Sequence, residues 1–138
     1  MGVAADFFRS EGPGEVARLT VLRDRLLDGI LARVADSRLT GARGAGRLPH
    51  HASLLTPGVK ADAVLMELDL RGVSASSGSA CASLTEQPSH VLRAIGCDGA
   101  LAESSLCFTL GRWTTAPEID VVLDVLPTIV TRLRRLAP

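Results

Sequence analysis

The stretch Ser74-Ala75-Ser76-Ser77-Gly78-Ser79-Ala80-Cys81-Ala82-Ser83 is the part of the sequence around which the rest of the chain is organised. Its small side chains cannot form core, so it predicts a mobile or closely approached loop. Glycine and serine let the backbone bend sharply and leave the Cys81 thiol accessible, as a nucleophile that must travel requires. Composition alone also allows a plainer interpretation, a flexible linker that happens to carry a cysteine.

The segments on either side of this loop predict a mixture of helices and strands. Apolar residues recur at helical spacing, so helices are expected over 15–36, 61–70, 89–95 and 117–136. Strands are expected over 48–55, 73–75 and 104–110, with at most a short strand and a loop over 37–46. In the last strand Leu106, Phe108 and Leu110 alternate with polar neighbours, so Cys107 should point away from them. Pro127 should kink the last helix or break it locally.

This order of elements lacks a regular βαβ alternation and therefore indicates the α+β class. We expect a small, mainly antiparallel sheet with helices packed on one face. Residues 1–14 hold Gly2, Gly12, Pro13 and Gly14 and predict a flexible lead-in, and residues 15–138 form a single domain. Periodicity predicts a core of Leu19, Leu22, Leu26, Ile30, Leu65, Leu68, Val91, Leu92, Leu106, Phe108, Ile119, Leu123, Leu126 and Val130.

Composition limits the function classes that remain. The chain has 138 residues, of which 46% are hydrophobic, and only three Phe, one Trp and no Tyr, so the core must be aliphatic. Fifteen basic and fifteen acidic residues leave no net charge, which disfavours a nucleic acid or an anionic membrane as partner. No long apolar run suggests a signal peptide or a membrane span, and a cytoplasmic location is expected.

The cysteines and histidines do not predict a disulfide framework or a metal site. Cys81, Cys97 and Cys107 are an odd number at wide spacing, which favours reduced thiols. His50 and His51 are adjacent and share a face on neither helix nor strand, so no metal is expected.

The residues around Cys81 resemble the active-site loop of cysteine desulfurases with a Ser-Ser-Gly-Ser-Ala-Cys motif. Further motifs follow in that family's order over about residues 47–136, most of its C-terminal small domain. They are Arg47-Leu48-Pro49-His50, Pro57-Gly58-Val59, Leu65-Met66-Glu67-Leu68, Pro88-Ser89-His90-Val91-Leu92-Arg93-Ala94-Ile95-Gly96, Leu110-Gly111-Arg112 and Glu118-Ile119-Asp120. The resemblance implies the small domain of a class V aminotransferase-like, fold-type I pyridoxal-phosphate enzyme.

The resemblance also implies a role for the loop. In that family pyridoxal phosphate binds the substrate cysteine, and the loop cysteine attacks its sulfur, leaving a persulfide and alanine. The residue that matches this nucleophile is Cys81, and its active-site loop comprises Ser76, Ser77, Gly78, Ser79 and Ala80. A sulfur-acceptor protein is a further partner that the resemblance suggests.

Two departures from the family bear on activity. The large domain that carries the cofactor's lysine is absent, and the single lysine, Lys60, is expected to be a solvated surface residue, so this chain alone should bind no cofactor. Cys107 stands where the family usually has an arginine that clamps the substrate carboxylate, a task that a thiol cannot perform. Arg112 is expected to be structural and Cys97 a buried or incidental thiol. His90 and Arg93 are assigned to helix packing and loop anchoring.

Two classes of function therefore stay open. The first is part of a split cysteine desulfurase that supplies Cys81 to a separate pyridoxal-phosphate-binding large-domain chain. The second is a module without its own catalysis, which carries a persulfide or binds a partner. A truncated fragment of a desulfurase is a third alternative. The surface that a large domain would cover leads us to expect either such a complex or a homo-oligomer.

Overall fold

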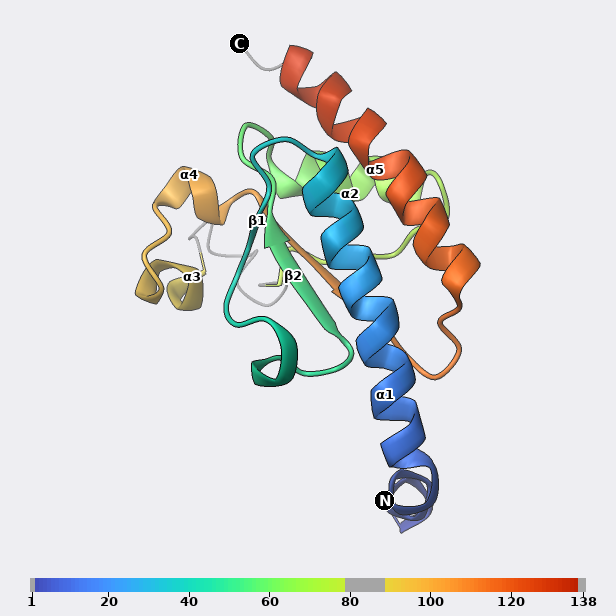
Figure 1. Cartoon of the computed structure of the whole chain (residues 1–138). Helices are drawn as coiled ribbons and strands as arrows, with labels where there is room; N and C mark the ends of the chain where they lie inside the picture. Colours follow the sequence, from blue (N-terminus) through green and yellow to red (C-terminus); the bar gives the residue numbers. More distant parts are fainter. Residues whose placement is uncertain (1, 79–88, 137–138) are drawn as a thin grey trace.

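The fold is built on a three-stranded antiparallel sheet in the order β1-β2-β3. The computed structural model describes residues 2–78 and 89–136. The strands are β1 (Arg38–Leu39), β2 (His51–Leu55) and β3 (Ser105–Thr109). Figure 1 shows the sheet between two groups of helices. The predicted α+β class with an antiparallel sheet is confirmed.

The pairing of β2 with β3 gives the sheet one apolar and one mainly polar face. Strands β2 and β3 pair over their full lengths, with Ser53 opposite Cys107 and Leu54 opposite Leu106. Ala52, Leu54, Leu106 and Phe108 point into the main core. Because side chains alternate along a strand, Ser53 and Cys107 project from the opposite side.

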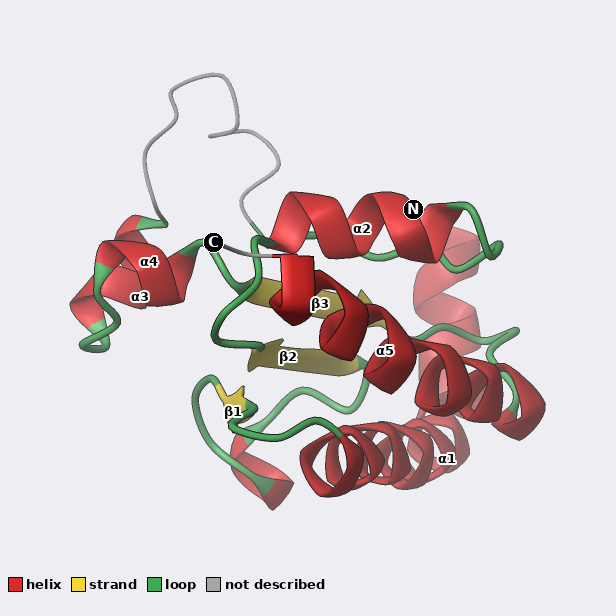
Figure 2. Ribbon diagram, turned by 90° about the horizontal axis from the view of Figure 1, so that it is seen from above, coloured by secondary structure: helices red, strands yellow, loops and turns green. Residues whose placement is uncertain are grey.

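Three helices cover the apolar face: α1 (Gly2–Arg33), α2 (Ala61–Asp69) and α5 (Ala116–Leu136). Figure 2 shows α1 and α5 side by side, with α2 beside them. Gly29 lets α1 approach α5 closely, because a Cβ at this position would lie 2.6 Å from the Cδ2 atom of Leu123. The two longest helices are therefore held together by direct contact of backbone against side chain.

Two short helices, α3 (His90–Ala94) and α4 (Gly99–Ala102), cover one end of the opposite face. Each starts with a capping side chain, since Ser89 Oγ accepts from the Leu92 amide at 3.4 Å and Asp98 Oδ1 accepts from the Leu101 amide at 2.7 Å. Leu92 and Ala102 pack with Leu55 of β2 in a small second cluster. The rest of this face carries no helix in the part of the chain that the structure describes.

Most of the predicted core is confirmed. Leu65 is partly buried and packs against the core. Val91 is 57% exposed, so the assignment of Val91 to the core is wrong. The helix that carries Val91 has about one and a half turns and directs only Leu92 at the sheet. Ala52 and Leu54 of β2 are fully buried but were not among the predicted core residues.

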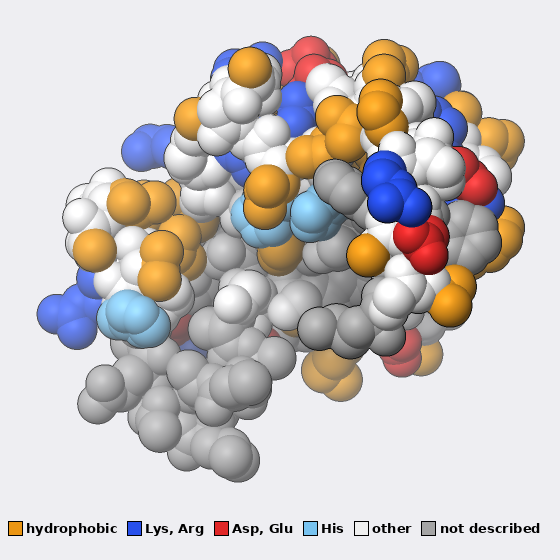
Figure 3. Space-filling view, turned by 90° about the horizontal axis from the view of Figure 1, so that it is seen from below, with side chains coloured by type: hydrophobic (Ala, Val, Ile, Leu, Met, Phe, Trp, Pro, Cys, Tyr) orange, Lys and Arg blue, Asp and Glu red, His pale blue; other side chains and the backbone are white. Residues whose placement is uncertain are grey.

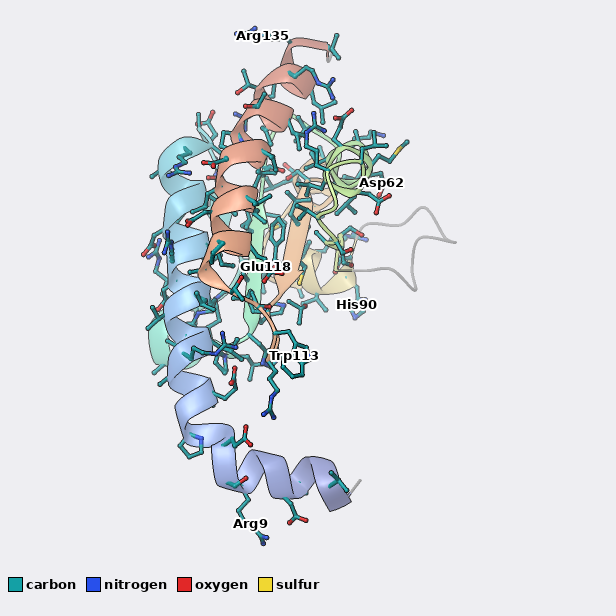
Figure 4. The ribbon with its side chains drawn as sticks, turned by 90° about the vertical axis from the view of Figure 1, so that its right-hand side faces the viewer. Arg9, Asp62, His90, Trp113, Glu118 and Arg135 are labelled. Atoms are coloured by element: carbon teal, nitrogen blue, oxygen red, sulfur yellow. The ribbon has the colours of Figure 1, made fainter. Side chains whose placement is uncertain are left out.

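Several predicted boundaries are wrong. Residues 2–14 belong to α1 and do not form a loose lead-in, although Figure 4 shows the turns that carry Arg9 running at a steep angle to the rest of the helix. Pro13 lies inside this helix, where its missing N–H removes a hydrogen bond and favours such a bend. By contrast, α5 continues through Pro127 as one helix. The predicted strand over 73–75 is replaced by an isolated bridge between Ser76 and Cys107, and α4 was not predicted.

A buried cation connects α1 to the loop before β2. The side chain of Arg23 is 1% exposed and pairs with Asp24 Oδ1 at 2.8 Å. Its Nη1 donates to the carbonyl oxygens of Arg47 and Leu48, both at 3.0 Å. This loop contains the 3₁₀ turn Gly44–Gly46, and none of residues 41–50 is buried, so the guanidinium supplies contacts that hydrophobic packing does not.

We expect Arg23→Met to lower the free energy of unfolding by about 2–3 kcal/mol, because two carbonyl groups would lose a charged donor. The matched control is Arg25→Met on the same helix, whose half-exposed pair with Asp120 should contribute less than about 1 kcal/mol. Urea denaturation followed by circular dichroism measures both. Equal effects of the two substitutions would contradict the role given to Arg23.

A second prediction concerns the contact between α1 and α5. Gly29→Ala should destabilise the fold by about 1–3 kcal/mol, because the added methyl group overlaps Leu123 in a packed core. Gly14→Ala is the control, since a Cβ there meets nothing within 4 Å, and alanine should leave stability unchanged or raise it by up to about 1 kcal/mol. Thermal melts of the two variants should therefore shift in different directions; a stabilised Gly29→Ala protein would refute the close contact.

Candidate functional site

The start of the predicted active-site loop lies at the edge of the sheet. The Ser76 amide donates to the Cys107 carbonyl at 3.0 Å, and the Cys107 amide donates to the Ser76 carbonyl at 2.7 Å. The loop therefore leaves the sheet from the free edge of β3. Ser76, Ser77 and Gly78 are placed, whereas Ser79, Ala80 and the predicted nucleophile Cys81 lie outside the described residues.

Gly78 shapes the chain just after this anchor. Its amide donates to Ser76 Oγ at 3.0 Å, and its φ of 82° lies in the left-handed region that favours glycine. A Cβ added here would lie 3.9 Å from the Cβ of Cys107, which is ordinary contact. Backbone conformation rather than lack of space thus explains a glycine at this position.

The side of the sheet opposite the core, which we call the outer face, is polar. It carries Thr40, His51, Ser53, Cys107 and Thr109, of which Thr40 donates to Ser53 Oγ at 2.6 Å. The Sγ atom of Cys107 lies 3.4 Å from Nε2 of His51. In the view from below, Figure 3 shows histidine side chains at the surface of the molecule. The structure thus brings together a thiol and an imidazole that the sequence analysis did not combine.

The protonation states of this pair follow from burial and from a nearby cation. Burial lowers the pKa of His51, and the charges of Arg47 and His50 lower it further, so its imidazole is neutral at pH 7. Burial raises the pKa of Cys107 from its ordinary value of 9.0, while the Thr109 side chain and the charge of Arg47 act in the opposite direction. At rest the pair is therefore a neutral thiol beside a neutral imidazole.

Arg47 stands next to this pair but is held by backbone groups. Its guanidinium donates to the carbonyl oxygens of Thr40 and Ala42, the latter at 2.7 Å. Desolvation and the charge of Arg23 lower the pKa of Arg47, yet a guanidinium stays charged at neutral pH. It supplies a fixed positive charge near His51 and Cys107.

The described residues do not fit pyridoxal phosphate. Lys60 is the only lysine of the sequence, and its side chain is 79% exposed, with Nζ 3.6 Å from Glu103 Oε2. A lysine that forms an imine needs a desolvated site, whereas this side chain is solvated. The prediction of a solvated surface lysine is confirmed.

The other motif residues have structural rather than chemical positions. Arg112 pairs with Glu11 at 2.8 Å and lies 5.5 Å from the ring centroid of Trp113, in line with the structural role predicted for it. Cys97 is half-buried against the second cluster, as expected. His90 and Arg93 are both exposed on α3, so their predicted role in helix packing is wrong.

The described residues contain neither a metal-binding cluster nor a membrane-spanning helix. No three His, Cys, Asp or Glu side chains in this part of the chain gather as a metal site would require. None of the described helices has both the length and the apolar composition needed to cross a lipid bilayer.

The combination of His51 with Cys107 was missed because the two residues lie 56 positions apart. The alternation in the predicted strand over 48–55 contained part of the signal, since it places His51 on the same face as Ser53 and away from Ala52 and Leu54. The register that sets β2 against β3 was not available from the pattern.

Comparison with known proteins finds relatives along the whole chain. No protein-family model matches. An IscS-like cysteine desulfurase of Mycobacterium tuberculosis is 46% identical over 88% of this chain and 31% of its own length. Cysteine desulfurase IscS 1 of Archaeoglobus fulgidus is 39% identical over 99% of this chain, and cysteine desulfurase IscS of Dictyoglomus turgidum is 41% identical over 100% of it; each is covered over 35% of its length. The chain thus spans about a third of the relatives it matches.

Solved structures show the same fold. The NifS-like protein from Rickettsia africae superposes with a TM-score of 0.79 at 22% sequence identity, over 94% of this chain and 33% of the other. A second NifS-like protein gives a TM-score of 0.73 at 21% identity. Sequence and fold together show that this chain is a homologue of one third of a cysteine desulfurase, its C-terminal small domain.

Proposed function

We propose that this chain serves as the sulfur-carrying small domain of a cysteine desulfurase, with Cys81 as the residue that holds sulfur as a persulfide. The supporting observation is the homology over the whole chain to cysteine desulfurases. The segment that bears Cys81 starts at a fixed point, the backbone pairing of Ser76 with Cys107. An anchored loop of small residues suits a thiol that meets both a sulfur donor and an acceptor.

The chemistry proposed for Cys81 is a transfer of sulfane sulfur. Its thiolate attacks the terminal sulfur of a persulfide donor, R–S–SH, and forms a new S–S bond. The S–S bond of the donor breaks, and R–S⁻ leaves and takes up a proton as R–SH. The product is a persulfide on Cys81, and no external oxidant or reductant is needed.

The proposed partner is a pyridoxal-phosphate-binding large domain on a separate chain, with a homo-oligomer as the other form of association. The lack of a suitable lysine supports a partner that brings the cofactor. The outer face supports the same view, because it carries several polar side chains and, among the described residues, helices cover only one end of it. We propose that this face meets the large domain, in the cytoplasm, where thiols remain reduced.

The position of Cys107 favours a second candidate function, a persulfide carrier without desulfurase activity. A thiol cannot bind a carboxylate as an arginine does, and the nearby Arg47 already donates to backbone carbonyls. Free cysteine would therefore be poorly oriented as a substrate. The two candidates differ in the sulfur donor: a desulfurase also takes sulfur from the substrate cysteine, whereas the carrier accepts it only from an existing persulfide.

We expect Cys81 to be the first thiol to react with limiting iodoacetamide and the main site of loading from glutathione persulfide. The run of small residues around Cys81 in the sequence predicts an accessible thiol, whereas Cys97 is half-buried against the second cluster. Peptide mapping by mass spectrometry locates both modifications. Cys81→Ser should remove most of the loading and Cys97→Ser should leave it unchanged; unchanged loading in Cys81→Ser would end the proposed role.

A second expectation concerns the cofactor. After incubation with pyridoxal phosphate and dialysis, the purified chain should retain no absorbance of a bound cofactor, and Lys60→Arg should behave identically. The reason is that Lys60 is exposed and paired with Glu103. Stoichiometric retention that is lost in Lys60→Arg would show that this chain holds the cofactor itself.

A further inference from the structure

We propose that Cys107 and His51 form a second sulfur-accepting site on the outer face, which reacts with small persulfides independently of Cys81. The Sγ and Nε2 atoms lie 3.4 Å apart, within hydrogen-bonding reach for sulfur. A nucleophile with a base at such a distance is the arrangement that activates a thiol. This site goes beyond the proposed function, which assigns sulfur only to Cys81.

The pair is held in place by the sheet. Cys107 pairs with Ser53, and His51 precedes Ser53 by two residues, so the two side chains are diagonal neighbours on one face. The backbone of Cys107 is also bonded on its other side to Ser76. Since both residues belong to paired strands, the distance between thiol and base depends on the register and not on a loop.

The geometry places thiol and base in contact, and the surroundings act on the two charges in different ways. In the tautomer that carries its proton on Nδ1, neutral His51 can accept a proton at Nε2. The cation of Arg47 stabilises the thiolate that results and disfavours the imidazolium, and burial disfavours both charges. Among the described residues, the Thr109 side chain also acts on Cys107 and the charge of His50 acts on His51, while Arg23 and Asp24 act on Arg47. Burial keeps the resting thiol protonated, so a base is needed to form the thiolate.

The reaction balances without any further reagent. Nε2 of His51 takes the proton from Sγ of Cys107, and the thiolate attacks the terminal sulfur of a persulfide R–S–SH. The S–S bond of the donor breaks as the new S–S bond to Cys107 forms. His51 returns its proton to the departing R–S⁻, which leaves R–SH and a persulfide on Cys107.

The experiment uses the full chain with Cys81→Ser, so that only the second site and Cys97 remain. Glutathione persulfide is the probe, and mass spectrometry maps the added sulfur over time. We expect loading at Cys107, which Cys81→Ser/Cys107→Ser removes and Cys81→Ser/Cys97→Ser leaves unchanged. Loading at Cys97, or none at Cys107, would overturn the proposal. Neither outcome at Cys107 affects the test of Cys81, because that test is made on the chain that retains Cys81.

The role of His51 is tested by His51→Gln in the same background. The loading rate at pH 7 should fall about tenfold or more, and the difference should shrink as pH rises because the thiolate then forms without a base. A merely structural role would lower the rate equally at every pH, and an unchanged rate would exclude the base. If His51→Gln fails to fold, the pH dependence of the loading rate of Cys81→Ser serves as the test. The loading rate of an unaided thiol falls about tenfold per pH unit below the pKa of the thiol. A thiol assisted by His51 gives a flatter profile at pH values above the pKa of His51.

Discussion

The arrangement of the outer face depends on the hydrogen bonds that the buried guanidinium of Arg23 donates. This guanidinium reaches from α1 to the carbonyl oxygens of Arg47 and Leu48, in a loop of which residues 41–50 are not buried. Arg47 in turn donates to Thr40 and Ala42 and places its charge near His51 and Cys107. A helix on one side of the sheet thus fixes the electrostatics of the other side.

The long elements could be predicted from sequence because their apolar residues repeat with a clear period. Helix α5 presents Ile119, Leu123 and Leu126 on one face, and β3 alternates Leu106 and Phe108 with polar residues. Local rules were weaker where two effects compete. Gly12, Pro13 and Gly14 suggested a loose segment, but the chain continues as a helix and accommodates the proline by a bend.

The candidate site was only partly predictable, for a reason of geometry. Motif order identified the cysteine loop and Cys107 as positions of interest, because these features are continuous in sequence. The contact between Cys107 and His51 depends on how β2 pairs with β3, and a shift of one residue would send His51 to the core face. Register is a tertiary property, so spacing along the chain does not contain it.

Cys107 combines a fixed backbone with a replaceable side chain. Its amide and carbonyl bind Ser76 on one side, and its strand pairs with β2 on the other, whichever side chain it carries. The backbone at this position is therefore fixed by the sheet, whereas the chemistry of its side chain can vary. A change of side chain here alters charge, reach and reactivity while the backbone hydrogen bonds of the sheet stay the same. The same logic makes this position a suitable place to introduce new side chains by design.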